Sequence, residues 1–527
     1  MEFQSWDTLH LQLERTPVCP IASPRMNDDA RPDQLVDEEG NLLEGGFGLR
    51  QKIGLFLGLM LFACTLFAPP VFGLDVPASK VALLAITMAV LWITEAVPIP
   101  ATALLPLVLL PIVGVAPVKE VAAPYADPII FLFMGGFMLA LAMERWNLHR
   151  RIALGIIDAV GTRPRALIMG FLCAGTFLSM WTSNSATAMM LLPIGISVYG
   201  LLKEGGGVSM GAREFGAALV LSIAYGANIG GLGTLIGTPP NALLKAHMEK
   251  VHNVDVSFGQ WMLLGVPLVL VSLPLVYFIL TRISFRVPNE EVPGLGDAIH
   301  RERTNLGSMS RGEWAVAAAF GAAIVLWVSR ELWKTTPLGV VVTDEVIAMG
   351  AAVLLFFVPL DFKHGIFVLD WQCMKKLPWD VLILFGGGLS LAAAFQKTGL
   401  VTSMATAMEG MKSLPPLSIV FLVVAVMTAA TALTSNTATT AAFLPVISGL
   451  AAAVNQPAIL LCVPVAIAAS ADFALPVGTP PNAIAYGSGL VSLPRMVKAG
   501  IWVDLLFVIL IPIMMWTVGR WAFNIPG

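Results

Sequence analysis

The sequence predicts an all-α polytopic membrane protein with re-entrant hairpins and broken transmembrane helices. Of its 527 residues, 57% are hydrophobic and only 12% are charged, which lies outside the range of soluble domains. Apolar runs long enough to cross a bilayer, about 20 residues each, recur along most of the chain and give about 11 spans. Two polar or helix-breaking motifs interrupt these runs, and each motif occurs twice in the same order.

The elements follow one another after a polar start. Residues 1–50 are polar, acidic and proline-containing, which predicts a cytosolic tail. Residues 81–115 are long enough for two spans with a bend at Glu95, which we place at the cytosolic surface. The apolar runs cover residues 53–74, 81–115, 129–143, 166–202, 217–246, 261–280, 314–329, 345–360, 381–394, 417–454, 458–485 and 501–518. Two of them, 166–202 and 417–454, are counted as re-entrant hairpins and not as full spans.

These runs divide into two halves. Residues 51–283 hold the first span and repeat 1, with a hairpin at 166–202 and a broken helix at 217–246. A polar linker follows at 284–313. Residues 314–527 form repeat 2, with a hairpin at 417–454 and a broken helix at 458–485.

The positive charges predict the orientation of the spans. With the N-terminus in the cytosol, the cytosolic loops hold roughly 22 of the 31 Lys and Arg residues. An odd number of spans then places the C-terminus outside. Because the linker joins two repeats of odd span count, the repeats enter the membrane from opposite sides and are inverted.

The doubled motifs carry the repeat. Thr-Ser-Asn-Ser-Ala-Thr at residues 182–187 matches Thr-Ser-Asn-Thr-Ala-Thr at 434–439, an offset of 252 residues. Gly-Thr-Pro-Pro-Asn-Ala occurs identically at 237–242 and 478–483. A single Ser-Asn island is compatible with ordinary hydrogen bonding between helices. Two matched islands, each followed by a matched helix break, favour a secondary transporter whose binding site lies between repeats.

The chemistry of the motifs predicts binding of cations and of an anion. Ser, Asn and unwound backbone offer the oxygen atoms that a sodium ion requires, and the proline pairs force a helix to break. The half-helix after each break directs its N-terminal amides into the cavity. The side chains placed to hydrogen-bond a carboxylate are Asn184, Ser185, Asn436 and Thr437, followed by Thr238 and Thr479.

The residues absent from the motifs are equally informative. No Lys or Arg lies inside the four motifs, so a dianion there would be neutralised only by helix ends and amides. Bound cations would supply the missing charge, which predicts cation-coupled anion transport. The segment Gly-x-x-x-x-Gly-Lys is absent, so the Gly-Thr-Pro-Pro motif is not a nucleotide-binding loop.

Asp472 is an acid within an apolar span, and its counterpart in the first half is Gly231. An intramembrane acid is a functional candidate, so Asp472 is a possible coupling residue; the alternative is a neutral or hydrogen-bonded carboxyl that faces the scaffold. We expect no enzyme, because Asp472 has no evident catalytic partner. A channel is disfavoured because no ring of charged residues is visible, and the chain has no basic stripe for nucleic acid.

At these motifs the chain resembles the divalent anion:sodium symporter family, from about residue 54 to the C-terminus. The family's paired Ser-Asn-Thr signatures match residues 183–185 and 435–437, with Ser185 in place of the first Thr. The resemblance implies one sodium site at Ser179, Ser183, Asn184 and Gly237, and another at Thr431, Thr434, Asn436 and Gly478. It also implies substrate contacts from Asn184, Ser185, Asn436, Thr437, Pro239 and Pro480, and a homodimer that works by an elevator motion.

The expected function is therefore a sodium-coupled symporter of the cell (inner) membrane that imports C4-dicarboxylates such as succinate, malate and fumarate. Its expected partners are the dicarboxylate, sodium ions, the lipid bilayer and a second copy of the chain. Two alternatives of the same fold remain open: a sodium-independent dicarboxylate exchanger, and a citrate or sulfate carrier.

Overall fold

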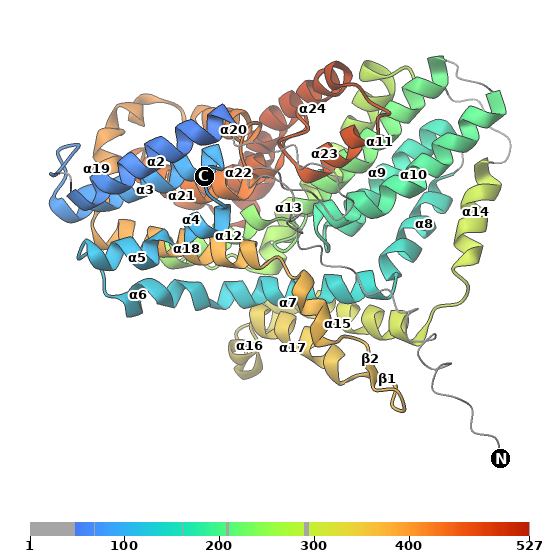
Figure 1. Cartoon of the computed structure of the whole chain (residues 1–527), viewed down its shortest axis with the longest axis horizontal. Helices are drawn as coiled ribbons and strands as arrows, with labels where there is room; N and C mark the ends of the chain where they lie inside the picture. The colour runs from blue at the N-terminus through green and yellow to red at the C-terminus, as the bar shows by residue number, and fades with distance from the viewer. Residues whose placement is uncertain (1–47, 68, 162, 207–209, 289–294, 526–527) are drawn as a thin grey trace, which may run out of the picture. The chain divides into compact units, whose positions relative to one another are not determined.

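Figure 1 shows the computed structural model of the chain. The structure describes residues 48–525 except 68, 162, 207–209 and 289–294, so most of the predicted tail lies outside the described residues. The chain divides into two compact units, residues 1–53 and 54–527. Of the first unit only the start of helix α2 is described, and the helices below belong to the second.

In its described residues the first half contains helices and connecting segments, and no strand. Its longest helices bear the apolar sequence runs, and several begin at a polar cap: Asp75 accepts the Ala78 N–H at 2.9 Å, and Asp127 accepts the Ile129 N–H at 3.1 Å. The elements are α2 (Leu49–Phe67), α3 (Val76–Thr94), α4 (Ile99–Ala103), α5 (Leu105–Ile112), α6 (Val118–Ala122), η1 (Ala123–Ala126), α7 (Pro128–Arg145), α8 (Leu148–Val160), α9 (Pro164–Ser179), α10 (Asn184–Gly206), α11 (Met210–Gly231), α12 (Pro239–His252), α13 (Phe258–Phe278) and η2 (Ile279–Ser284).

The second half contains the linker helix α14 and then a similar succession. Ser310 and Glu313 form a capping box at the start of α15. The elements are α14 (Leu295–Asn305), α15 (Arg311–Trp333), α16 (Pro337–Val341), α17 (Asp344–Phe357), β1 (Pro359–Asp361), β2 (Ile366–Phe367), η3 (Trp371–Lys376), α18 (Trp379–Lys397), α19 (Leu400–Ala407), η4 (Glu409–Ser413), α20 (Pro416–Thr431), α21 (Asn436–Ala453), α22 (Ala458–Ser470), α23 (Pro480–Gly487), α24 (Leu493–Met514), η5 (Met515–Gly519) and α25 (Arg520–Ala522).

Seven helical stretches in the described residues are long and apolar enough to cross a membrane. They are Leu49–Phe67, Val76–Thr94, Val118–Arg145, Phe258–Ser284, Arg311–Trp333, Trp379–Lys397 and Leu493–Ala522. Four predicted spans are not among these seven, because they are divided into shorter helices or are too short to cross a membrane as one helix. They are residues 96–115, 217–246, 345–360 and 458–485. The total of 11 spans therefore stays a prediction.

Local structure differs from the sequence expectation in two places. Strands β1 and β2 pair antiparallel, because Gly365 at φ 66° allows a tight turn between them. The predicted linker contains helix α14, which contacts α8 through the ion pair of Arg150 with Glu302 at 2.7 Å. The predicted bend is present: Glu95 is exposed and ends α3 in a left-handed conformation, at φ 52°.

Glycines allow helices of this unit to approach one another closely. A Cβ on Gly135 of α7 would lie 2.6 Å from the backbone of Ala348 in α17, and a Cβ on Gly387 of α18 would overlap the backbone of Ala103. The neighbouring Gly388 is different, because its nearest contacts, Ala441 and Leu243, would lie at 3.6 Å. Close packing is therefore the role of Gly135 and Gly387.

Substituting Gly387 with alanine should destabilise the protein by about 1–3 kcal/mol, because a methyl group there overpacks a helix crossing. The matched control is Gly388→Ala, where the methyl group has ordinary van der Waals space. That variant should be neutral or slightly stabilising, since alanine is a better helix former than glycine. Thermal melting of the two purified variants in detergent tests the difference. Equal melting temperatures would show that the crossing at Ala103 is not tightly packed.

Candidate functional site

The first predicted hairpin consists of α9 and α10, which meet at residues 180–183. Ser183 Oγ accepts the Ala186 N–H at 3.2 Å and so caps α10. The hydroxyls of Thr182 and Thr187 lie 2.8 Å apart and close the tip. Asn184 consequently stands at the N-terminus of α10, where unpaired backbone amides carry a partial positive charge.

The second hairpin, formed by α20 and α21, has a tip of the same construction. The hydroxyls of Thr434 and Thr439 lie 2.5 Å apart, at the positions that correspond to Thr182 and Thr187 with the offset of 252 residues. Asn436 begins α21 as Asn184 begins α10. The two halves thus share the side-chain contacts of the tip as well as its sequence.

Each predicted helix break is held together by the asparagine of its Gly-Thr-Pro-Pro-Asn motif. Asn241 Nδ2 donates to the carbonyl oxygens of Gly231 at 2.9 Å and Thr234 at 2.8 Å. Asn482 Nδ2 donates to the carbonyl oxygens of Asp472 at 3.3 Å and Leu475 at 3.1 Å, which are the corresponding positions. The asparagines therefore satisfy carbonyl groups that the interrupted helices leave without a partner.

The two breaks contact each other. Asn228 of α11 donates from Nδ2 to Thr479 Oγ1 at 3.0 Å, and the same nitrogen lies 3.3 Å from Asn482 Oδ1. On the other side, the hydroxyls of Thr238 and Ser470 lie 3.3 Å apart. Helix α11 contacts α23, and α12 contacts α22 and α21. The polar motifs of the two halves are therefore joined in one region.

Acceptor oxygens outnumber donors beside the first hairpin. One terminal atom of the Asn184 amide lies 2.6 Å from Ser179 Oγ, 3.2 Å from the Gly237 carbonyl oxygen and 3.3 Å from that of Ala227. An amide nitrogen in this place has two hydrogens for three acceptors. An amide oxygen in this place would gather four oxygen atoms, and oxygen ligands of this kind bind sodium in transporters with broken helices.

A similar excess of oxygen atoms is present beside the second hairpin. Thr431 Oγ1, in a fully buried residue, lies 2.6 Å from Asn436 Oδ1 and 2.8 Å from the Ala469 carbonyl oxygen. A hydroxyl has one hydrogen and serves only one of these acceptors well. The structure thus brings together Ser179, Asn184 and Gly237 in the first half, and Thr431 and Asn436 in the second.

The other predicted sodium ligands, Ser183, Thr434 and Gly478, make different contacts. Ser183 and Thr434 use their hydroxyls within the hairpin tips, as the cap of α10 and in the bond from Thr434 to the Ala430 carbonyl at 2.7 Å. Gly478 lies against Asp472, since a Cβ built on this glycine would overlap the carboxylate.

The predicted substrate contacts differ in their exposure. Ser185 and Thr437 are half-buried, and within the described part of the chain neither hydroxyl makes a hydrogen bond to protein. Thr238 and Thr479 are buried and bonded within the region of the breaks. Pro239 is half-buried, whereas Pro480 is exposed. Ser185 and Thr437 are therefore the hydroxyls free to bind a ligand.

The basic residue nearest in sequence to the breaks has its charge paired. Lys245 of α12 is 2% exposed, and its Nζ lies 3.0 Å from Asp255 Oδ1 and 4.0 Å from Glu345 Oε1. Two carboxylates therefore compensate this ammonium group. It adds no free positive charge for an anion held at the breaks.

Asp472 is completely buried, and neither of its carboxylate oxygens has a hydrogen-bond partner of good geometry. Asp504 of α24 reaches the adjacent backbone, with Oδ1 accepting the Phe473 N–H at 2.9 Å. The sequence prediction did not include Asp504 or Asn228. Both are polar residues in apolar helices, and this signal was sufficient to nominate them.

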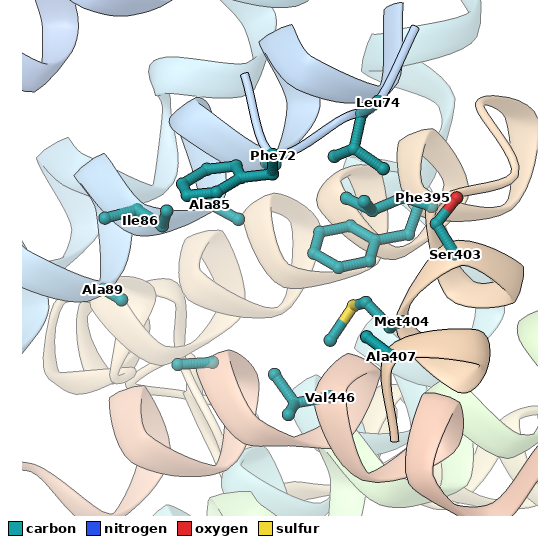
Figure 2. Close-up of a pocket in the computed structure, with 13 residues that line it drawn as sticks. Phe72, Leu74, Ala85, Ile86, Ala89, Phe395, Ser403, Met404, Ala407 and Val446 are labelled. Carbon is teal, nitrogen blue, oxygen red and sulfur yellow. The ribbon is translucent and has the colours of Figure 1, made fainter. Parts of the chain in front are cut away.

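A separate cavity of about 340 Å³ lies beside α3, α19 and α21 (Figure 2). Phe72, Ile86, Phe395 and Met404 are among its lining residues, and Ser403 is the only polar one. Such a lining offers no group to compensate a dianion, so the cavity is not a candidate site for a dicarboxylate.

Comparison with known proteins identifies the family. The protein family described as the sodium:sulfate symporter transmembrane region matches residues 49–525. The sodium-dependent dicarboxylate transporter SdcS of Staphylococcus saprophyticus is 43% identical over 497 residues, which cover 93% of this chain and 95% of that protein. The protein of the same name from Staphylococcus aureus is 41% identical over 485 residues, covering 90% and 92% of the two chains.

Two solved structures share the fold at low sequence identity. The YdaH transporter of Alcanivorax borkumensis superimposes with a TM-score of 0.55 at 12% identity, over 91% of this chain and all of that one. MtrF of Neisseria gonorrhoeae does so with a TM-score of 0.55 at 11% identity, over 89% and 98% of the two chains. From the region matched and the two relatives, the chain belongs to the divalent anion:sodium symporter family.

Proposed function

We propose that this chain is a sodium-coupled symporter that imports C4-dicarboxylates such as succinate, malate and fumarate across the cell membrane. The observation that carries the proposal is the excess of acceptor oxygens around Asn184 and Asn436, each at the start of a helix. The relatives named as sodium-dependent dicarboxylate transporters support the same reading.

The proposal gives the two halves equivalent tasks. One sodium ion binds at Ser179, Ser183, Asn184 and Gly237, and the other at Thr431, Thr434, Asn436 and Gly478. In this assignment Ser183, Thr434 and Gly478 contribute backbone oxygens, because the two hydroxyls are used within the tips. The dicarboxylate contacts Asn184, Ser185, Asn436 and Thr437, with Thr238, Pro239, Thr479 and Pro480 forming the wall behind them.

Charge compensation explains why the two binding events are coupled. A dianion in a region of low dielectric is unfavourable without positive charge, and Lys245 is already paired. Two sodium ions would cancel the charge of the dianion. The helix N-termini at Asn184, Pro239, Asn436 and Pro480 add partial positive charge. Each sodium ion thereby raises the affinity for the substrate, and the substrate raises the affinity for sodium.

The two halves are proposed to be inverted repeats of a homodimeric elevator transporter with a cytosolic N-terminus and an external C-terminus. The matched bonds at both hairpin tips and both breaks support the repeat. In this arrangement the hairpins and broken helices carry the substrate, while the long apolar helices contact the lipid bilayer. Asp472 acts as a coupling residue, because its buried carboxyl group has no hydrogen-bond partner among the described residues.

Uptake of radiolabelled succinate into proteoliposomes tests the proposal. We expect an inward sodium gradient to drive accumulation, and an inward proton gradient with choline in place of sodium to fail. Sodium-independent uptake that requires internal unlabelled succinate would identify an exchanger and overturn the symporter assignment. Stronger competition by sulfate or citrate than by malate and fumarate would replace the C4-dicarboxylate assignment with one of the two other anions.

A further inference from the structure

The least compensated polar group in the described chain is the Asp472 carboxylate. The residue is fully buried, and both of its oxygens lack a hydrogen-bond partner, although the Ala474 N–H lies near. In the described residues no Lys, Arg or His forms an ion pair with Asp472 or with Asp504. A buried carboxylate without a counter-charge is strongly unfavourable, so this group requires either a bound proton or a bound cation.

Three other oxygen-bearing groups converge on the same backbone segment, residues 472–473. Asn228 and Tyr225 lie one turn apart on α11, and Asn228 Nδ2 contacts the Asp472 carbonyl oxygen at 3.3 Å. The Tyr225 ring packs edge-on against Phe473, with centroids 5.1 Å apart. Asp504 of α24 accepts the Phe473 N–H at 2.9 Å.

Two of these groups are also unsatisfied. Asn228 Oδ1 and the Tyr225 hydroxyl are buried without hydrogen-bond partners, in residues that are fully buried. Tyr225 and Asp504 both contact Phe473, the residue next to Asp472. The cluster therefore holds four unpartnered oxygen atoms: both oxygens of the Asp472 carboxylate, Asn228 Oδ1 and the Tyr225 hydroxyl oxygen.

Among the described residues of the first half there is no equivalent of this cluster. Its position corresponding to Asp472 is Gly231, and a Cβ there would lie 2.8–3.0 Å from the Asn184 amide. An acidic side chain would therefore displace Asn184 from the first oxygen cluster. The acidic group is confined to the second half, where the break is followed by α24 and its Asp504.

We propose that Asp472, Asp504, Asn228 and Tyr225 form an additional binding site for a monovalent cation, separate from the two oxygen clusters at the hairpins. The inference rests on the proposed function, because it takes sodium as the cation. Carboxylate, amide and phenol oxygens are hard ligands suited to sodium, and the bound ion compensates the buried negative charge. The loaded carrier then holds one cation more than its dicarboxylate substrate requires, which makes transport sensitive to membrane potential.

Sodium binding to this site can be measured without transport, from the melting temperature of the purified protein as sodium replaces choline in the buffer. Asp472→Asn removes the uncompensated charge, so the variant should melt at the same or a higher temperature in choline. Sodium should also raise the melting temperature of this variant by less than that of the wild type, because a ligand stabilises only the state that binds it. Tyr225→Phe keeps the ring against Phe473 and should raise the sodium concentration needed for half of the melting shift by about ten-fold.

The matched control is Asp158→Asn, which removes one carboxylate from α8 at its surface ion pair with Arg303. It should leave the sodium titration unchanged. If Asp472→Asn does not insert into the membrane, the sodium titrations of Tyr225→Phe and the wild type are compared instead. Unchanged sodium titrations in both site variants would overturn the additional cation site.

A second readout separates this failure from a failure of the proposed function. In proteoliposomes, an inside-negative potential should accelerate sodium-driven succinate uptake by the wild type, and the acceleration should be lost in Asp472→Asn. Potential-independent uptake in a sodium-dependent wild type would overturn the additional site and leave the symporter intact. Sodium-independent uptake by the wild type would overturn the proposed function itself, while the melting titration still decides whether the site binds sodium.

Discussion

Asn184→Ala and Asn436→Ala should each abolish sodium-dependent succinate uptake while the protein still inserts into the membrane. Each amide lies within 2.6 Å of a buried hydroxyl and at the start of a helix, so its removal takes away a proposed ligand of sodium and of the carboxylate together. Loss of one charge-assisted contact costs about 1.5–3 kcal/mol, and loss of two coupled contacts should reduce uptake by about 100-fold or more.

Uptake and membrane abundance should be measured in the same vesicles. Asn305→Ala is the matched control, since Asn305 is exposed at the end of α14 and lies far along the chain from either hairpin. Normal uptake by either the Asn184 or the Asn436 variant would refute the assignment of that half-site. Loss of uptake with loss of insertion would be a folding effect, and the more conservative changes to aspartate would then test the ligand role.

Asn241→Ala should destabilise the protein more than Asn482→Ala, although both asparagines hold a helix break in the same way. Each substitution leaves two carbonyl groups without a donor, and an unsatisfied buried group costs about 1–3 kcal/mol. The first break, residues 231–238, is buried throughout, so no water replaces the lost bonds. The second break is open at Val477, which is 74% exposed, and Leu475 is half-buried.

Thermal melting of both variants in the same detergent measures the difference, with the wild type and Asn305→Ala as references. We expect the lower melting temperature for the Asn241 variant. The reverse order would mean that solvent reaches the first break or that the second break bears more of the packing. Equal and small losses would contradict the role of these asparagines in holding the breaks.

Local signals in the sequence were sufficient for the main elements of the fold. The proline pairs at residues 239–240 and 480–481 removed backbone donors, and helices α12 and α23 begin there as expected. The Ser-Asn islands likewise separate α9 from α10 and α20 from α21. Membership of the family was also readable from these motifs, and the comparisons confirmed it.

The roles of individual side chains were less accessible. The family resemblance implied Ser183 and Thr434 as sodium ligands without saying through which atoms, and the structure uses their hydroxyls within the hairpin tips. Asn241 and Asn482 were seen as parts of a motif, and only their bonds to backbone carbonyls explain why asparagine is needed. A hydroxyl or an amide has several possible partners, and sequence spacing does not choose among them.

Composition and repetition alone settled that this chain is a helical membrane protein with two matched pairs of hairpin and break, because hydrocarbon admits only helices or protected breaks. Tertiary structure decided which polar atoms remain without partners. Asn228 contacts Thr479 across 251 residues, and Asp504 of α24 accepts the N–H of Phe473, the residue next to Asp472. Such contacts depend on how distant helices pack, so the lack of hydrogen-bond partners for the Asp472 carboxyl group became visible only when the two halves were in place.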